Sequence, residues 1–300
     1  MDAEFFTSAT AMLRAAAAGI SYDHIAAAHG VTKSTVSARV RRLARTLQQV
    51  VGVLDVDEDA SPTASLLRHH RHAYLEALEH FRPSAAQALL DPAHTLTKAQ
   101  LELLQKKIIQ HSHAPLRDQA LLLALFSTGA KPLEIAQLTV HDYINAEGHV
   151  KVHSILRAEI ATNHADRPLL FDCADTVAAI DTYLAERCAK QLGTSADHSF
   201  RGLEPASRLF LTREGRPMRI YRPANRNNQV AVCKEMHNIY QRIFNHGGLT
   251  GLNTACARRM TALRLRARGA SPQDIGYALG VKCAAVHQLL KGTTGSQHAK

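Results

Sequence analysis

The stretch YDHIAAAHGVTKSTVSARVRRL, residues 22–43, predicts two short helices joined by a tight turn. Ala26 is small enough to let two helices approach closely, and Gly30 stands where such a turn often needs a positive φ. Thr32 is placed to cap the second helix. The buried side would be formed by Ile25, Val31, Val36 and Val40.

This spacing is typical of a helix-turn-helix, whose second helix enters the major groove of DNA. Short polar side chains at the start of that helix suit base edges, and arginines near its end suit phosphates. The alternative is a generic three-helix packing unit. The DNA-contacting residues that we predict here are Lys33, Ser34, Thr35, Ser37, Arg39, Arg41 and Arg42.

The charge of the whole chain favours a polyanionic partner. Its 300 residues carry a formal net charge of +10, and the pI is about 9.6. The excess of positive charge lies in the C-terminal third. Residues 246–300 contain eight lysines and arginines, and Asp274 is their one acidic residue. Aromatic residues are 5% of the chain and tryptophan is absent, so stacking on single-stranded bases fits poorly. We therefore expect double-stranded DNA as the partner.

Other classes of protein fit the composition less well. The five cysteines are scattered without a CxxC pair, which argues against a metal site or a disulfide framework and favours a reducing cytoplasm. The histidines at 69, 70 and 72 point to different helix faces, so we expect them to be solvated. The longest apolar runs, such as residues 120–126, are too short for a bilayer, and the acidic start MDAEFF is unlike a signal peptide. We expect a cytoplasmic, nucleoid-associated protein without cofactor, metal or membrane partner.

The pattern along the chain predicts a mainly α-helical protein with a small β-sheet. Residues 1–54 form the helix-turn-helix-like region, residues 55–95 an acidic linker with connecting helices, and residues 96–300 one continuous domain. A single amphipathic helix is expected over 66–81. Strands are expected at 149–156 and 167–172, with a short one at 208–212. No internal repeat is evident.

Three segments of the third region match a known family in order and spacing. They are LRDQALLLALFSTGAKPLEIAQLTVHDY (116–143), RLFLTREGRPM (208–218) and LTGLNTACARRMTALRLRARGASPQDIGYALGV (249–281). Together they resemble the catalytic domain of the tyrosine recombinases, the family of phage integrases and Xer-like enzymes. The resemblance covers about residues 97–292 and implies a tyrosine-recombinase-like fold there. A basic helix also occurs in the core-binding domains of recombinases, so residues 22–43 have that second interpretation.

The resemblance also implies where the family's phosphate-binding residues fall. The first arginine falls on Lys131, which keeps the charge but loses the bidentate fork of arginine. The second arginine falls on Arg258 and is intact. The family's lysine has no lysine counterpart, since the segment between the two strands offers Arg157, His164 and Arg167.

The residues that perform the family's chemistry are replaced. The two histidine positions fall on Ala255 and Val281, and the attacking tyrosine falls on Leu290. Alanine and valine cannot transfer protons, and leucine cannot attack a phosphate. We therefore predict that the chain is not an enzyme. Its remaining DNA contacts would be Lys131, Arg216, Arg219, Arg222, Arg226, Arg258 and Arg259.

These observations predict a non-catalytic, sequence-specific duplex DNA-binding protein. We expect a transcriptional regulator, associated with a mobile element if it follows the family, and a homodimer if its site is palindromic. Three alternatives stay open. They are an active recombinase with a displaced nucleophile, an accessory factor in partition or replication control, and a protein-interaction scaffold.

Overall fold

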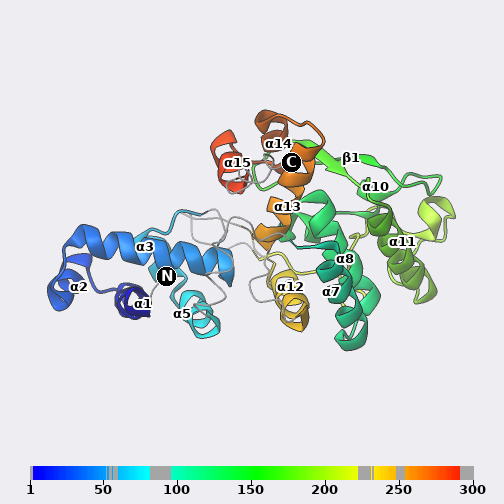
Figure 1. The fold of residues 1–300 in the computed structure, drawn as a ribbon. Coiled ribbons are helices and arrows are strands. Elements are labelled where there is room, and N and C mark those ends of the chain that lie inside the picture. Colours follow the sequence, from blue (N-terminus) through cyan, green and yellow to red (C-terminus); the bar gives the residue numbers. More distant parts are fainter. Residues whose placement is uncertain are drawn as a thin grey trace. The chain divides into compact units, whose positions relative to one another are not determined.

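The computed structural model describes residues 3–51, 53, 56, 60–81, 96–221, 231, 233–247 and 254–290. The chain divides into two compact units (Figure 1), one holding the described helices up to Phe81 and the other the elements from Leu96 onward. The described residues are mainly α-helical with one two-stranded sheet, which confirms the predicted fold class. No helix within these ranges is both long and apolar enough to cross a membrane.

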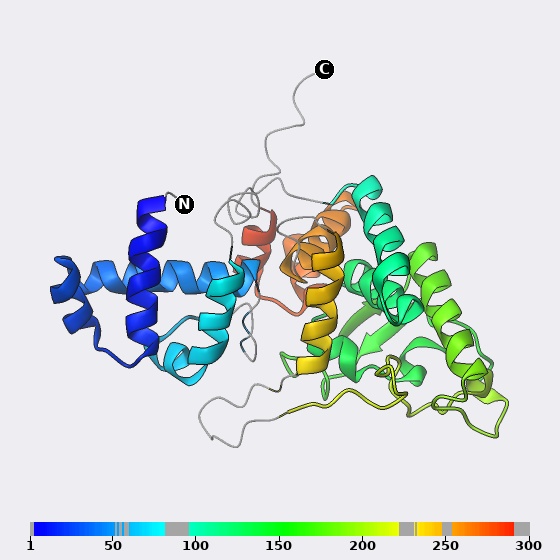
Figure 2. The same ribbon diagram turned by 90° about the horizontal axis from the view of Figure 1, so that it is seen from below.

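The first unit is built on a long helix whose apolar residues recur at helical spacing. On α3 (Lys33–Val50), Val36, Val40, Leu43 and Leu47 are all fully buried. The helix α1 (Ala3–Ala17) packs across this apolar stripe, and Figure 2 shows the crossing. The helix α2 (Tyr22–His29) covers the N-terminal end of α3. One apolar face per helix thus produces one core.

Two further helices complete this core, where the sequence predicts a single helix over 66–81. The expected helix over 66–81 divides at His70 (φ −104°, ψ 30°) into α4 (Ala64–His69) and α5 (Arg71–His80). Leu67 and Tyr74 are fully buried in the same cluster as the apolar residues of α1 and α3. The described residues 64–81 therefore belong to the first unit.

The second unit surrounds a buried central helix. In α8 (Pro115–Thr128) nearly every residue after the first turn is buried. Around it pack α7 (Lys98–His111), α11 (Ala174–Ala189) and α13 (Thr254–Ala267), as Figure 1 shows. The remaining elements of this unit are α9 (Pro132–Gln137), α10 (Val140–Tyr143), the 3-10 turn η1 (Ser199–Gly202), α12 (Lys234–Gly247), α14 (Pro272–Leu279) and α15 (Cys283–Leu290).

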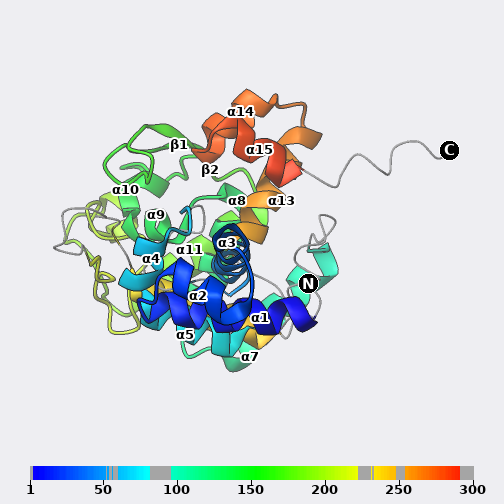
Figure 3. The same ribbon diagram turned by 90° about the vertical axis from the view of Figure 1, so that its left-hand side faces the viewer.

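The small sheet is an antiparallel hairpin of β1 (His153–Leu156) and β2 (Arg167–Leu170), both shorter than predicted. In Figure 3 the hairpin lies next to α14, and β2 packs against that helix. The third predicted strand, 208–212, forms only isolated bridges. There the buried Arg187 guanidinium donates to the carbonyl oxygens of Arg208 and Leu209, at 2.8 and 3.1 Å.

Two sets of three consecutive helices, α1–α3 and α13–α15, share local features of packing and turn geometry. Helices α13, α14 and α15 pack against one another in all three pairs, as α1, α2 and α3 do. The turns between the last two helices both use a left-handed glycine, Gly30 with φ 62° and Gly280 with φ 64°. Corresponding residues lie 250 positions apart.

Candidate nucleic-acid interface

The turn between α2 and α3 has the geometry that the sequence predicts. Gly30 adopts the left-handed conformation (φ 62°, ψ 32°), and the N–H of Val31 donates to the carbonyl oxygen of Ala26 at 3.0 Å. The hydroxyl of Thr32 caps α3 by accepting from the N–H of Thr35 at 3.2 Å. The roles predicted for Gly30 and Thr32 are confirmed. Because the cap satisfies a free N–H, α3 starts directly after the turn.

The apolar side of this motif is also confirmed. Val36 and Val40 are fully buried, Ile25 is 2% exposed, and Ala26 is 6% exposed. Val31 is half-buried and packs against the same cluster. Since the apolar side faces the core, the opposite side of α3 faces solvent and is free to meet a partner.

The exposed side of α3 carries polar and basic residues. Ser34, Arg41 and Arg42 are exposed, and the Arg42 guanidinium lies 4.9 Å above the ring of Phe5. Lys33 is exposed and forms an ion pair with Asp23 at 2.8 Å. Such a surface pair contributes at most about 1 kcal/mol, so Lys33 can exchange Asp23 for a phosphate at little cost.

Three residues that we predicted as DNA contacts are half-buried instead. The Arg39 guanidinium donates to the hydroxyl of Ser8 at 2.7 Å and so ties α3 to α1. The Thr35 hydroxyl lies 2.8 Å from that of Thr32, within the cap. Ser37 is half-buried as well. Arg39 and Thr35 therefore stabilise the motif rather than present a free polar group.

Two basic residues that we did not predict extend the exposed surface. Arg45 is exposed one turn after Arg41, on the same face, and the i, i+4 spacing could have identified it. Arg68 lies on α4, near the hydroxyl of Tyr22 together with Arg41. Burial raises the pKa of Tyr22, and the charges of Arg41 and Arg68 oppose that shift. Tyr22 is the first residue of α2, so these two cations lie near a helix N-terminus, where phosphates bind readily.

In the second unit a buried carboxylate organises the residues around Lys131. The Glu134 carboxylate accepts from the N–H of Lys131 at 2.7 Å and from the N–H and hydroxyl of Thr162 at 2.9 and 3.0 Å. It also forms an ion pair with Arg167, and both side chains are 1% exposed. Arg167 donates in turn to the carbonyl oxygen of Ala278 on α14 at 2.8 Å. This cluster joins the start of α9, the hairpin and α14.

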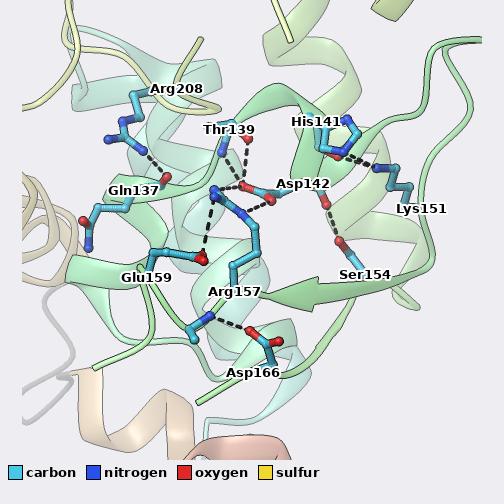
Figure 4. Close-up of polar contacts among 11 residues, drawn as sticks. Gln137, Thr139, His141, Asp142, Lys151, Ser154, Arg157, Glu159, Asp166 and Arg208 are labelled. Atoms are coloured by element: carbon cyan, nitrogen blue, oxygen red, sulfur yellow. Dashed lines mark hydrogen bonds and ion pairs between the residues drawn. The ribbon is translucent and has the colours of Figure 1, made fainter. Parts of the chain in front are cut away.

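Of the three candidates for the family's lysine, Arg157 and Arg167 are engaged by carboxylates. Arg157 binds Asp142 through two hydrogen bonds of 2.9 and 3.1 Å (Figure 4). Arg167 is held by Glu134 as described above. Burial lowers the pKa of Arg167, the charge of Glu134 opposes this shift, and the nearby charge of Arg258 adds to it. His164 is exposed, at a positive φ of 55°.

Arg258 is not placed as we predicted for a phosphate contact. Its side chain is buried, with 3% exposure, near Arg167. A duplex cannot touch it while it stays covered. Arg259 and Lys131 are half-buried, and Arg216 and Arg219 are exposed. The predicted contacts Arg222 and Arg226 lie outside the described residues.

Leu290, to which the sequence resemblance assigns the family's tyrosine, is part of a hydrophobic core. Leu290 is 6% exposed and packs with Ala262, Ile275, Leu279 and Val286. The two histidine positions, Ala255 and Val281, are half-buried.

Five of the seven tyrosines are buried or half-buried and have raised pKa values. Burial raises the pKa of Tyr22, Tyr74, Tyr143, Tyr183 and Tyr240. The Tyr143 hydroxyl donates to Asp181 at 2.9 Å, and that of Tyr240 donates to the carbonyl oxygen of Leu121 at 3.1 Å. Attack on a phosphate needs a lowered pKa or an adjacent base, whereas burial has the opposite effect. Tyr221 and Tyr277 are exposed.

Comparison with known proteins gives distant structural likenesses. No protein-family model and no curated protein matches the chain. Among solved structures, the XerA recombinase aligns at 15% identity and a TM-score of 0.45, over 84% of this chain and 77% of its own. A Tn1549 transposon integrase (aa 82-397), in complex with circular intermediate DNA, aligns at 18% identity and a TM-score of 0.44, over 93% and 94%. With identities below 25% and TM-scores below 0.5, these likenesses do not assign the chain to a family.

Proposed function

We propose that this chain is a non-catalytic, sequence-specific duplex DNA-binding protein. The observation that carries the proposal is the geometry of α2, the Gly30 turn and α3. Its apolar side is fully used by the core, and its opposite side carries exposed polar and basic residues. A helix of this kind fits the major groove, where its first turn meets base edges and its later arginines meet phosphates.

The exposed residues of α3 divide into these two roles. Ser34 and Ala38 are exposed one turn apart near the start of the helix, where a small side chain permits close approach to the bases. Arg41, Arg42 and Arg45 follow on the exposed side and supply charge for the backbone. Phosphate contacts fix the register, and base contacts then give the specificity.

The absence of strand cleavage is part of the same proposal. The sequence resemblance assigns the nucleophile position to Leu290, which lies in a hydrophobic core, and the proton-transfer positions to Ala255 and Val281. Cleavage of a phosphodiester by a tyrosine needs all three functions, together with neutralisation of the phosphate. A protein that binds without cutting suits regulation of transcription, and genome-wide occupancy measured together with transcript changes would assign that role.

The proposal is tested with a trapping substrate. A duplex selected by the full chain from a random-sequence library is nicked next to each phosphate of the selected site in turn. We expect retention of the duplex on a native gel and no protein–DNA adduct on a denaturing gel. Arg41→Ala should weaken retention, and Lys106→Ala, an exposed charge on α7, should not. A covalent adduct at any hydroxyl, or no retention by the wild-type chain, would overturn the proposal.

A further inference from the structure

The helices α13, α14 and α15 match α1, α2 and α3 at the turn, cap and core positions, at a constant spacing of 250 residues. Each stretch before the second helix contains a glycine with positive φ, at Gly19 (95°) and Gly269 (90°), followed by a capping serine, Ser21 or Ser271. The core positions also correspond. The matched buried pairs are Ile25 and Ile275, Ala26 and Gly276, Val36 and Val286, and Val40 and Leu290.

The backbone hydrogen bonds follow the same scheme. The N–H of Ile20 donates to the carbonyl oxygen of Ala15 at 3.1 Å, as Ala270 does to Leu265. Across the two turns, Val31 donates to Ala26 at 3.0 Å, and Val281 donates to Gly276 at 2.9 Å. The two sets of helices, α1–α3 and α13–α15, therefore have the same turn conformation, corresponding core positions and the same backbone hydrogen bonds around the turn.

The turn between α14 and α15 is supported differently from the turn between α2 and α3. A Cβ on Gly30 would meet nothing within 4 Å, whereas a Cβ on Gly280 would lie 2.9 Å from the Nε of Arg167. The Gly280 turn is therefore braced by the Arg167 side chain of the hairpin. The first turns of α15 stay accessible, with exposed residues at Lys282, Ala284, His287 and Gln288.

We propose that α15 is a second DNA-recognition helix, so that the chain contacts two segments of one duplex site. This inference rests on the proposed function, because it assumes that the first unit binds DNA. The charge of helices α13–α15 supports a DNA duplex as the partner that binds the exposed surface of α15. Among the exposed charged residues of 254–290, Arg266 and Lys282 are basic, Arg268 is paired with Asp172, and Asp274 is acidic, so the exposed side of these helices carries a net positive charge.

The correspondence also assigns positions for base contact. Ala284 and Gln288 match Ser34 and Ala38, the second and sixth residues of the recognition helix, and both are exposed on one face. A glutamine amide pairs with the N6 and N7 atoms of adenine, and an alanine methyl contacts the methyl group of thymine. The segment bound by α15 should therefore contain an A·T pair, with Lys282 on a neighbouring phosphate.

The test compares two sets of variants of the full chain on the same library-selected duplex. Gln288→Ala should weaken binding to the selected duplex by about tenfold and remove the preference at one A·T pair, so that duplexes altered at that pair bind the variant equally well. Lys282→Ala should shorten the footprint at that segment. Ser34→Ala should affect only the other segment. Gln110→Ala and Lys106→Ala, both exposed on α7, serve as matched controls, and thermal unfolding confirms that every variant is folded.

The outcomes separate the two proposals. If the wild-type chain does not bind the duplex, the proposed function itself fails. If it binds, but Gln288→Ala and Lys282→Ala keep the wild-type footprint and base preference, only the second recognition helix is excluded. If these two variants instead change the mass of the protein in sedimentation and leave the footprint intact, the α15 surface binds a second copy of the chain, and the inference is overturned.

Discussion

Replacing Glu134 by glutamine should destabilise the second unit strongly. The carboxylate is 1% exposed, accepts hydrogen bonds from Lys131 and Thr162, and neutralises Arg167, which is equally buried. Removing one partner of a buried ion pair leaves an uncompensated charge and costs about 3–5 kcal/mol. The glutamine oxygen can still accept from one of the N–H groups, so we expect a loss of about 3 kcal/mol. For a unit of this size that corresponds to a fall in Tm of about 6–12 °C.

The assay is scanning calorimetry of the full chain, in which the transition of the second unit is followed. The double variant Glu134→Gln, Arg167→Met removes the isolated charge and should recover at least half of the loss. Glu186→Gln breaks the exposed pair with Lys190 and serves as the control, with an expected cost below about 1 kcal/mol. If Glu134→Gln costs no more than this control, Glu134 does not organise the cluster as we describe.

Three further changes test other parts of the structure. Gly30→Ala places a Cβ at φ 62° without a clash, so it should cost about 1–2 kcal/mol from backbone conformation alone, and an unchanged urea midpoint would contradict this. Burial raises the pKa of Asp172, but the ion pair with Arg268 outweighs burial and holds the folded pKa below the unfolded value. The pair therefore stabilises the fold above about pH 4, and this stabilisation is lost as the pH falls further. Asp172→Asn should make the free energy of unfolding less dependent on pH in this acidic range, and a pH profile identical to that of the wild type would refute the pairing. Leu290→Tyr should form no adduct on the trapping substrate, because Ala255 and Val281 still cannot transfer protons, and detection of an adduct would show that only the nucleophile was missing.

The local parts of the first unit could be predicted from the sequence because they depend on short-range rules. A glycine at the turn, a threonine before the helix and valines at i and i+4 each specify structure within a few residues. The Arg39 contact with Ser8 could not be predicted in this way, since it joins residues 31 positions apart. The packing of Tyr74 into the core of the first unit depends in the same way on distant parts of the chain.

In the second unit, too, the sequence predicts local features but not the contacts between residues far apart in the chain. The order of its elements follows from the periodicity of the sequence, but the burial of Arg167 depends on Glu134 and Ala278, which lie 33 and 111 positions away. The two sets of helices share residue type at the turn glycine, the capping serine and core positions such as Ile25 and Ile275, and elsewhere share conformation and burial alone. Ser34 on α3 corresponds to Ala284 on α15, so only the turn glycine, the cap and the core positions carry the pattern.

The most direct test of the central claim, that the exposed cations of α3 neutralise duplex phosphates, is the salt dependence of affinity. If Lys33, Arg41, Arg42 and Arg45 each meet one phosphate, a log–log plot of the binding constant against salt concentration should have a slope of about −4. Arg41→Ala should make the slope less steep by about 1, while Lys106→Ala leaves it unchanged. A flat response for the wild-type chain, or equal slopes for Arg41→Ala and the wild type, would contradict the claim.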